Sequence, residues 1–139
     1  RVNHLSAVLL SQKIIRHKLL LPEASVVFIS SVSAHKPSVG FGIYSASKAA
    51  LEAFARVFAL EVSGKGIRVN CVAPGMVHTP MFEYATDLIS EETMTEHEKE
   101  YPLGFANPQD VSPAVLFLLS KASQKITGVT ITIDGGYSL

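Results

Sequence analysis

The chain has 139 residues, of which 47% are hydrophobic and 17% charged, and its 12 basic residues balance its 12 acidic ones. This composition is typical of a globular domain, and the balanced charge argues against a nucleic-acid partner. No apolar run reaches the roughly 18 residues of a membrane helix and no signal-peptide pattern opens the chain, so we expect a cytoplasmic protein without a membrane partner. Cys71, the single cysteine, excludes an internal disulfide, and the histidines lack metal-ligand spacing, so no metal site is expected.

The first half of the chain alternates helix and strand. Apolar residues recur at helical spacing over about Leu5–Leu20, and Pro22 then blocks continuation. The β-branched and aromatic run Ser25–Ser30 predicts a strand that is buried on both faces. After a loop of small residues and turn formers, the segment from Tyr44 to about Ser63 predicts a long helix.

The second half repeats the alternation. Ile67–Val72 predicts a strand, Val111–Ser120 a helix, and Thr127–Asp134 a final strand. Between them, Glu83–Glu100 is loosely helical and holds seven of the twelve acidic residues but only one basic residue, Lys99. Alternation of this kind predicts an α/β fold in three layers, with a doubly wound parallel sheet between helices.

Two features indicate residues upstream of Arg1. A helical pattern is already running by Leu5 without a cap sequence, and three strands are few for a doubly wound sheet. We therefore expect residues 1–139 to form the C-terminal part of one domain whose first strands are absent from this sequence.

Tyr44 and Lys48 carry the clearest chemical signal. They stand four residues apart at the head of the predicted long helix, so one face presents both side chains. An unperturbed phenol has a pKa of about 10, and a neighbouring ammonium makes the phenolate easier to form. The pair could therefore exchange a proton with a substrate near neutral pH, although many helices contain Tyr and Lys at this spacing by chance.

Two further segments end at the same predicted sheet edge. Ser31 follows the first strand, and its hydroxyl could hold a substrate carbonyl beside the tyrosine, because α/β folds bind ligands at the carboxyl ends of their strands. Ser30 and Ser33 are expected in a solvated turn. Pro74 and Gly75 shape a turn after the second strand.

These pieces together resemble the short-chain dehydrogenase/reductase family, and within it the 3-oxoacyl-acyl-carrier-protein reductases. The resemblance spans the chain and implies a Rossmann-type fold. The matching segments appear in the family's order: Val2-Asn3, Phe28–Ser31, Tyr44–Lys48, Ile67–Asn70, Ala73–Gly75, Thr79, Thr127-Gly128 and Asp134–Gly136.

The resemblance implies a catalytic tetrad. Tyr44 would be the general acid in carbonyl reduction, Lys48 would assist it and bind the nicotinamide ribose, and Ser31 would orient the substrate oxygen. Asn3 would fix a backbone kink and a water that relays protons to Lys48.

The resemblance also implies a nicotinamide coenzyme, NAD or NADP, and a small carbonyl or alcohol as substrate. The turn at Pro74 and Gly75, the backbone of Val77 and the hydroxyl of Thr79 would hold the nicotinamide end. The acidic Glu83–Glu100 segment takes the position of the family's substrate lid.

The departures from the family pattern bear on the coenzyme. The glycine-rich turn that binds the coenzyme pyrophosphate is absent, because neither Gly40-x-Gly42 nor Gly64-x-Gly66 lies between a strand and a helix. The residue that separates NAD from NADP is absent too. We therefore expect the 139 residues to be inactive alone.

Two alternatives remain. One is a non-catalytic member of the fold that acts through association, and the other is an enoyl reductase, in which the family signature places the tyrosine and the lysine further apart. The long helices and the last strand are expected to form a homodimer or homotetramer with twofold symmetry.

Overall fold

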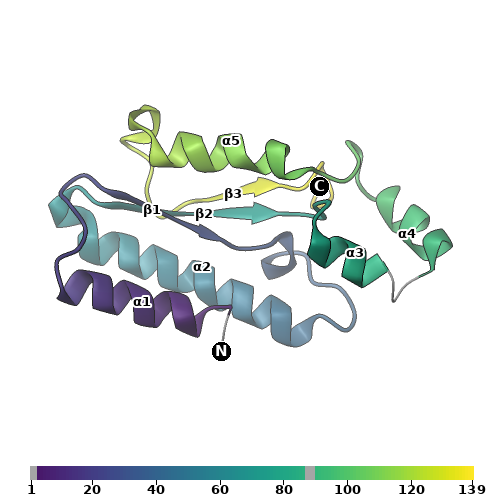
Figure 1. The fold of residues 1–139 in the computed structure, drawn as a ribbon, viewed down its shortest axis with the longest axis horizontal. Coiled ribbons are helices and arrows are strands. Elements are labelled where there is room, and N and C mark those ends of the chain that lie inside the picture. Colours follow the sequence, from purple (N-terminus) through teal and green to yellow (C-terminus); the bar gives the residue numbers. More distant parts are fainter. Residues whose placement is uncertain (1–2, 87–89) are drawn as a thin grey trace.

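The computed structural model describes residues 3–86 and 90–139, so Val2 and residues 87–89 of the acidic segment lie outside the described residues. Three parallel strands form one sheet between two layers of helices (Figure 1). The elements, in chain order, are α1 (Leu5–Arg16), β1 (Ser25–Ile29), η1 (Val32–Ala34), α2 (Gly42–Val62), η2 (Ser63–Lys65), β2 (Arg68–Pro74), α3 (Pro80–Thr86), α4 (Glu91–Glu98), α5 (Pro108–Leu119), η3 (Lys121–Ser123) and β3 (Thr130–Ile133). The three-layer α/β arrangement expected from the sequence is confirmed.

The strand order is β1-β2-β3, with β2 in the centre. Ser25 pairs with Arg68 at the start of β1, and Cys71 pairs with Thr130 where β3 joins. Because all strands run parallel, their carboxyl ends meet at one edge of the sheet (right in Figure 1). The ends of β1 and β2 and the short helices α3 and α4 lie at this carboxyl edge.

The helix α1 ends at Arg16, four residues before the predicted end near Leu20. Lys18 adopts a left-handed backbone with φ of 53°, Leu19 N donates to Ile14 O, and Lys18 N donates to Ile15 O. This paired hydrogen-bond pattern terminates many helices, normally with glycine at the left-handed position. Lysine there gives no sequence signal, which is why periodicity alone extended the helix too far.

The main core lies between α2 and the sheet. Its buried members include Ala55, Phe58 and Val62 from α2, and Val69 and Cys71 from β2. Cys71 is 1% exposed, so the sulfur packs as a small apolar group. The helices α1 and α2 cover one face of the sheet, and α5 covers the other (Figure 1).

The element ends on the α5 side depend on polar contacts. The Asp110 carboxylate accepts a hydrogen bond from Asn107 N at 2.6 Å, which caps the first turn of α5. The β3 strand begins at Thr130 rather than at Thr127. Before it, Thr127 Oγ1 accepts from Val69 N and Gly128 N donates to Val69 O, so these residues contact β2 without regular strand pairing.

A second, aromatic cluster fills the carboxyl edge beneath α4. Tyr101 and Tyr137 stack with ring centroids 4.4 Å apart, and Phe105 meets Tyr101 edge to face. Val32 of η1 packs into the same buried cluster. The cluster therefore joins the segment after β1 to the C-terminal turn.

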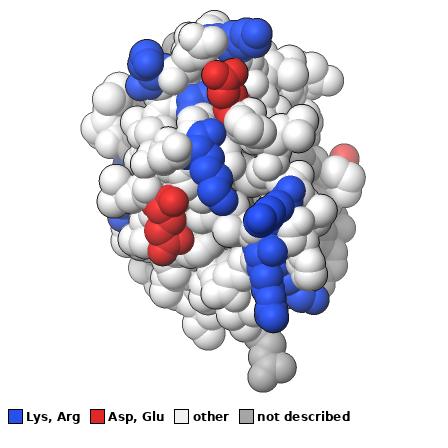
Figure 2. Space-filling model, turned by 90° about the vertical axis from the view of Figure 1, so that its left-hand side faces the viewer, with Lys and Arg blue, Asp and Glu red and all other residues white. Residues whose placement is uncertain are grey.

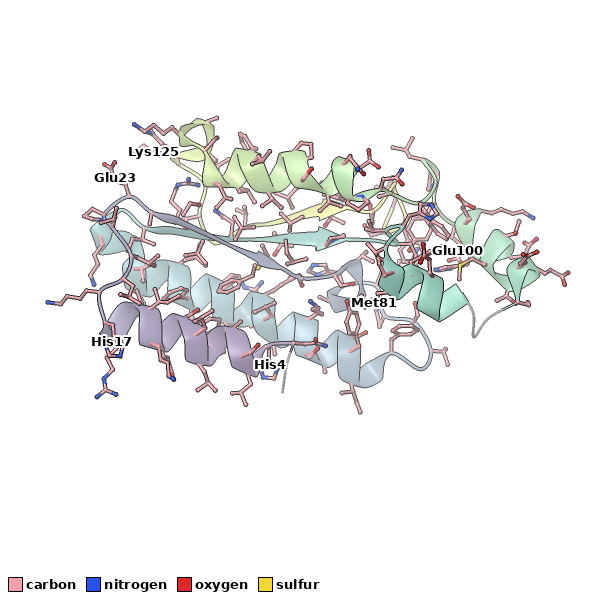
Figure 3. The ribbon with its side chains drawn as sticks, in the orientation of Figure 1. His4, His17, Glu23, Met81, Glu100 and Lys125 are labelled. Carbon is pink, nitrogen blue, oxygen red and sulfur yellow. The ribbon has the colours of Figure 1, made fainter. Side chains whose placement is uncertain are left out.

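Charge is divided between the two ends of the molecule. Figure 2 shows that the charged residues on the end where the strands begin are mostly Lys and Arg, with few acids among them. A hollow there is lined by Arg68, Lys121 and Lys125 together with Glu23 (Figure 3 labels Lys125 and Glu23). The acids of α4 and Glu100 lie at the opposite end. None of the helices in the described part of the chain combines the length and apolar character that crossing a bilayer requires.

Candidate active site

The first turns of α2 present Tyr44 and Lys48 toward the end of β1. Lys48 Nζ donates a 2.8 Å hydrogen bond to the carbonyl oxygen of Ile29, and it lies 5.7 Å from the centre of the Tyr44 ring. Tyr44 is half-buried and meets Phe41 edge to face. The structure thus places the ammonium and the tyrosine ring on the same side of α2, near the end of β1.

Burial lowers the pKa of the Lys48 ammonium, and the neighbouring Cys71 opposes this shift with a smaller rise. A lowered pKa makes an ammonium a stronger hydrogen-bond donor and a readier source of protons. One of the three ammonium hydrogens is bonded to Ile29 O, which leaves two donors for a ligand.

The end of β1 contacts α2 at the same place. Ser30 Oγ donates to the Lys48 carbonyl oxygen at 3.4 Å, and Ser30 is 3% exposed, so the prediction of a solvated turn is wrong for Ser30. It faces inward because the chain still follows the strand, with Ser30 N bonded to Val72 O. Ser31 follows directly, is also buried, and accepts a hydrogen bond from Ser33 N at 3.2 Å as the N-cap of η1.

Asn3, near the N-terminus of the chain, contacts the same helix. Its Nδ2 donates to Ser47 Oγ at 3.3 Å, and Ser47 Oγ donates to Tyr44 O at 2.7 Å. Asn3 therefore touches α2 one residue before Lys48 and through a serine that the sequence reading did not single out. An Asn–Ser contact across 44 positions leaves no local pattern in the sequence.

The turn after β2 brings Pro74, Gly75, Val77 and Thr79 to the carboxyl edge. A Cβ atom at Gly75 would lie 3.0 Å from Asp134 Cα and 3.0 Å from Tyr101 Cε1, so any side chain here would force its neighbours to move. Thr79 Oγ1 donates to Val77 O at 3.2 Å and accepts from Phe82 N at 3.3 Å, which ties its hydroxyl to the start of α3.

A pocket of about 280 Å³ opens beside this turn. Its floor is aromatic, because His78 meets Phe82 with ring centroids 4.7 Å apart and Phe105 at 6.0 Å. Met94 also lines the pocket, together with the acidic side chains of Glu91 and Glu98 from α4. His78 thus packs among rings, and the described residues hold no cluster of three or more His, Cys, Asp or Glu that could bind a metal ion.

A contact between a buried glutamate and a half-exposed histidine adjoins the site and was not predicted. Glu52 lies on α2 one turn after Lys48, and its Oε2 is 3.1 Å from Nε2 of His35 in the loop after η1. The four-residue spacing from Lys48 could have indicated that Glu52 shares the buried face of α2. Nothing in the sequence indicates its pairing with His35.

A parallel sheet covered on both faces, with Tyr44, Lys48 and Ser31 at its carboxyl edge, forms a Rossmann-type α/β domain, and folds of this kind bind their ligands at that edge. A family model described as "Enoyl-(Acyl carrier protein) reductase" matches residues 1–138. The chain belongs to the short-chain dehydrogenase/reductase family, which confirms the resemblance inferred from its motifs.

Named relatives agree with this assignment. The chain is 38% identical over 124 residues to the 3-oxoacyl-acyl-carrier-protein reductase FabG of Chlamydia pneumoniae, covering 88% of this chain and 48% of the relative. It is 41% identical over 138 residues to carbonyl reductase family member 4 of Danio rerio, covering 99% and 54%. A short-chain dehydrogenase family protein from Francisella tularensis superposes with a TM-score of 0.89 at 34% identity, covering 99% and 59%. The chain spans about half the length of the curated relatives it matches.

Proposed function

We propose that the protein containing this chain is an NAD(P)-dependent oxidoreductase that interconverts a carbonyl and an alcohol. The observation that carries the proposal is the geometry of Lys48, whose ammonium is fixed by Ile29 O beside the Tyr44 ring. The reductases among the relatives support the same reaction class.

In this proposal Tyr44 donates a proton to the carbonyl oxygen during reduction and accepts it during oxidation. Lys48 supplies positive charge beside the phenol and can pass on a proton, which its lowered pKa favours. Ser31 hydrogen-bonds the substrate oxygen, and Asn3 orders α2 and the proton path near Lys48 through Ser47.

The residues present fit the nicotinamide end of a coenzyme. Val77 and Ala106 form an isolated parallel β-bridge, in which His78 N donates to Ala106 O and Ala106 N donates to Met76 O. The N–H of Val77 takes part in neither hydrogen bond and can donate to the carboxamide. Lys48 keeps two hydrogens for ribose hydroxyls, and Gly75, Pro74 and Thr79 shape the wall. The bound coenzyme supplies the hydride, and the protein supplies position and the proton.

The proposal is tested by Tyr44→Phe in the complete product of the gene. The variant should lose carbonyl-reducing turnover by at least about a hundredfold, because proton transfer by a positioned group contributes about 10²–10⁴-fold. Coenzyme binding should change little, because the ring and Lys48 remain. The measurement is the rate of NADPH or NADH oxidation with a panel of ketones, alongside coenzyme titration; full activity in the variant would contradict the proposal.

A second prediction concerns the 139 residues by themselves. Coenzyme pyrophosphate is normally bound by backbone N–H groups at a glycine-rich helix N-terminus, whereas Gly64 and Gly66 follow a helix and lead into a strand. Losing several charge-assisted hydrogen bonds, of about 1.5–3 kcal/mol each, weakens a micromolar site by orders of magnitude. Calorimetric titration with NADH and NADPH should therefore show weak or no binding and no turnover, and a low-micromolar Kd would contradict this.

The description of the matching family model is consistent with the alternative, an enoyl reductase. The four-residue spacing of Tyr44 and Lys48 favours carbonyl reduction. Paired assays with 3-oxoacyl and 2-enoyl thioesters distinguish the two reactions. A protein that binds no coenzyme and reduces neither substrate would instead fit the non-catalytic alternative. The cytoplasmic location expected from the sequence remains a prediction that cell fractionation tests.

A further inference from the structure

Glu52 carries a carboxylate that is removed from water. Its side chain is only 3% exposed, Oε2 pairs with His35 Nε2, and Oε1 has no hydrogen-bond partner among the described residues. Burying a carboxylate is costly unless it is paired and hydrogen-bonded, so its contact with His35 governs where both side chains can lie. Displacing His35 would leave the buried Oε2 of Glu52 without this contact.

His35 and Ser31 lie at the two ends of one short turn. Ser31 is the N-cap of η1 and accepts from Ser33 N, and His35 is the C-cap, with its N–H bonded to Val32 O at 2.9 Å. The two ends of the turn are linked by hydrogen bonds, because Ala34 N also donates to Ser31 O at 3.0 Å. Fixing His35 against α2 therefore fixes the position of Ser31 as well.

The next residue along the chain is attached to a different element. Lys36 Nζ donates to Tyr137 O and lies 4.0 Å above the centre of the Tyr137 ring. Ser38 Oγ lies 3.4 Å from the Tyr137 hydroxyl, and Tyr137 stacks on Tyr101. Consecutive residues His35 and Lys36 thus hold the segment after β1 between α2 and the C-terminal turn.

We propose that Glu52 and His35 are positioning residues of the carbonyl-reducing site. The contact between their side chains holds η1 against the helix that carries Tyr44 and Lys48, and so sets where the Ser31 hydroxyl meets the substrate oxygen. This inference rests on the proposed function for its catalytic consequence. The structural part of it, the fixing of η1 by Glu52, stands on the geometry alone.

The structural part is tested by amide hydrogen exchange in the complete product of the gene. The amides of Ala34, His35 and Lys36 bond within η1 and report its order. In Glu52→Leu, which fills the buried site without a charge, and in His35→Ala, these amides should exchange at least tenfold faster. Glu52→Gln keeps an acceptor for His35 and should retain most of the protection.

Two features keep the test decisive. His35 has a side chain that is 46% exposed, so His35→Ala leaves the core intact even where Glu52→Leu folds poorly. Glu61→Gln removes an exposed carboxylate from the far end of the same helix and should leave the three amides unchanged. Unchanged exchange in both disrupting variants would overturn the proposal.

The catalytic part is tested by steady-state kinetics on the same variants. Glu52→Leu and His35→Ala should lower kcat about 10–100-fold, because misplacing a reacting group by about 1 Å can cost about a hundredfold. KM for the coenzyme should stay unchanged, and Glu52→Gln should restore most of the rate. Faster exchange with unaltered kcat would overturn the positioning role. If the unmodified protein reduces no carbonyl, the proposed function fails, and the exchange data alone decide whether Glu52 fixes η1.

Discussion

Lys48 and Glu52 lie one turn apart on α2, and both carry a polar end group that contacts a segment outside the helix. Their partners lie on segments distant in sequence, Ile29 O for the lysine and His35 for the glutamate. Lys48 therefore joins α2 to the end of β1, and Glu52 joins it to the segment after β1 that contains Ser31. The arrangement of side chains at this edge depends on long-range contacts of single residues rather than on one continuous motif.

Asp134 gives a prediction at the same scale. Burial pushes the pKa of Asp134 upward, but hydrogen bonds from Ser138 and Gly136 outweigh it, and the pKa lies below its usual range. A carboxyl group with a lowered pKa in the folded state stabilises the fold above its unfolded pKa of about 4 and loses this contribution as pH falls toward the folded value. The C-terminal turn should thus weaken in acid.

The variant that tests this is Asp134→Asn. At pH 7 it should reduce the free energy of unfolding by about 1–3 kcal/mol, because hydrogen bonds to a charged group are lost. At a pH below 3 the difference from the unmodified protein should shrink. Urea unfolding at both pH values gives the measurement, with the exposed Glu92→Gln as control. An equal loss of stability at both pH values would contradict the assigned cause.

At the scale of elements, α5 depends on its first turn. Asp110 accepts from Asn107 N and also places a negative charge at the helix N-terminus, where the helix dipole favours it. Asp110→Ala should therefore lower the free energy of unfolding by about 1 kcal/mol. Ser112 is an exposed residue of the same helix, and Ser112→Ala should change the free energy of unfolding by less than about 0.5 kcal/mol. Urea denaturation compares the two, and an equal effect would contradict a capping role.

The helices and strands were largely predictable, whereas several ends and contacts were not. Periodicity and β-branched runs located α1, α2, α5 and the strands. The prediction that the first strand is buried on both faces is wrong, because β1 lies at the edge of the described sheet, is half-buried over most of its length and leaves Ile29 47% exposed. The end of α1 was missed because Lys18 takes a backbone conformation that glycine usually signals. Buried Ser30 and the Glu52–His35 pair were missed because tertiary contacts, not local sequence, decide them.

The candidate site shows the same division. Tyr44 and Lys48 could be paired from their spacing on one helix, since helix geometry alone brings them together. Val77 and Thr79 were assigned only through the family resemblance. The structure adds that Thr79 caps α3, so its hydroxyl is already engaged.

At the scale of the whole molecule, α1 and α2 leave apolar side chains uncovered. Leu9 and Leu10 are 50% and 59% exposed on α1, and Val57 and Leu60 are 55% and 78% exposed on α2. Exposed apolar groups on adjacent helices mark an association surface, and we propose that a second copy covers it in a twofold dimer. The homotetramer expected from the sequence would add a second contact along β3.

Val57→Glu tests this surface. A charge placed in an apolar interface should shift the protein from dimer toward monomer at micromolar concentration, as measured by light scattering. Leu21→Glu, in the exposed loop between α1 and β1, should leave the assembly unchanged. A monomeric unmodified protein, or a Val57→Glu variant that stays dimeric, would contradict this placement of the interface.

The division of charge between the two ends has a consequence for the molecule in solution. The formal net charge is zero, yet basic residues gather where the strands begin and the acids of α4 lie at the opposite end. A neutral molecule of this kind has a large electric dipole moment, so neighbouring molecules attract end to end when few ions are present. Dissolved salt screens this attraction over about 10 Å at 0.1 M. Near pH 7 these 139 residues should therefore be salted in, becoming more soluble as the ionic strength rises from low values.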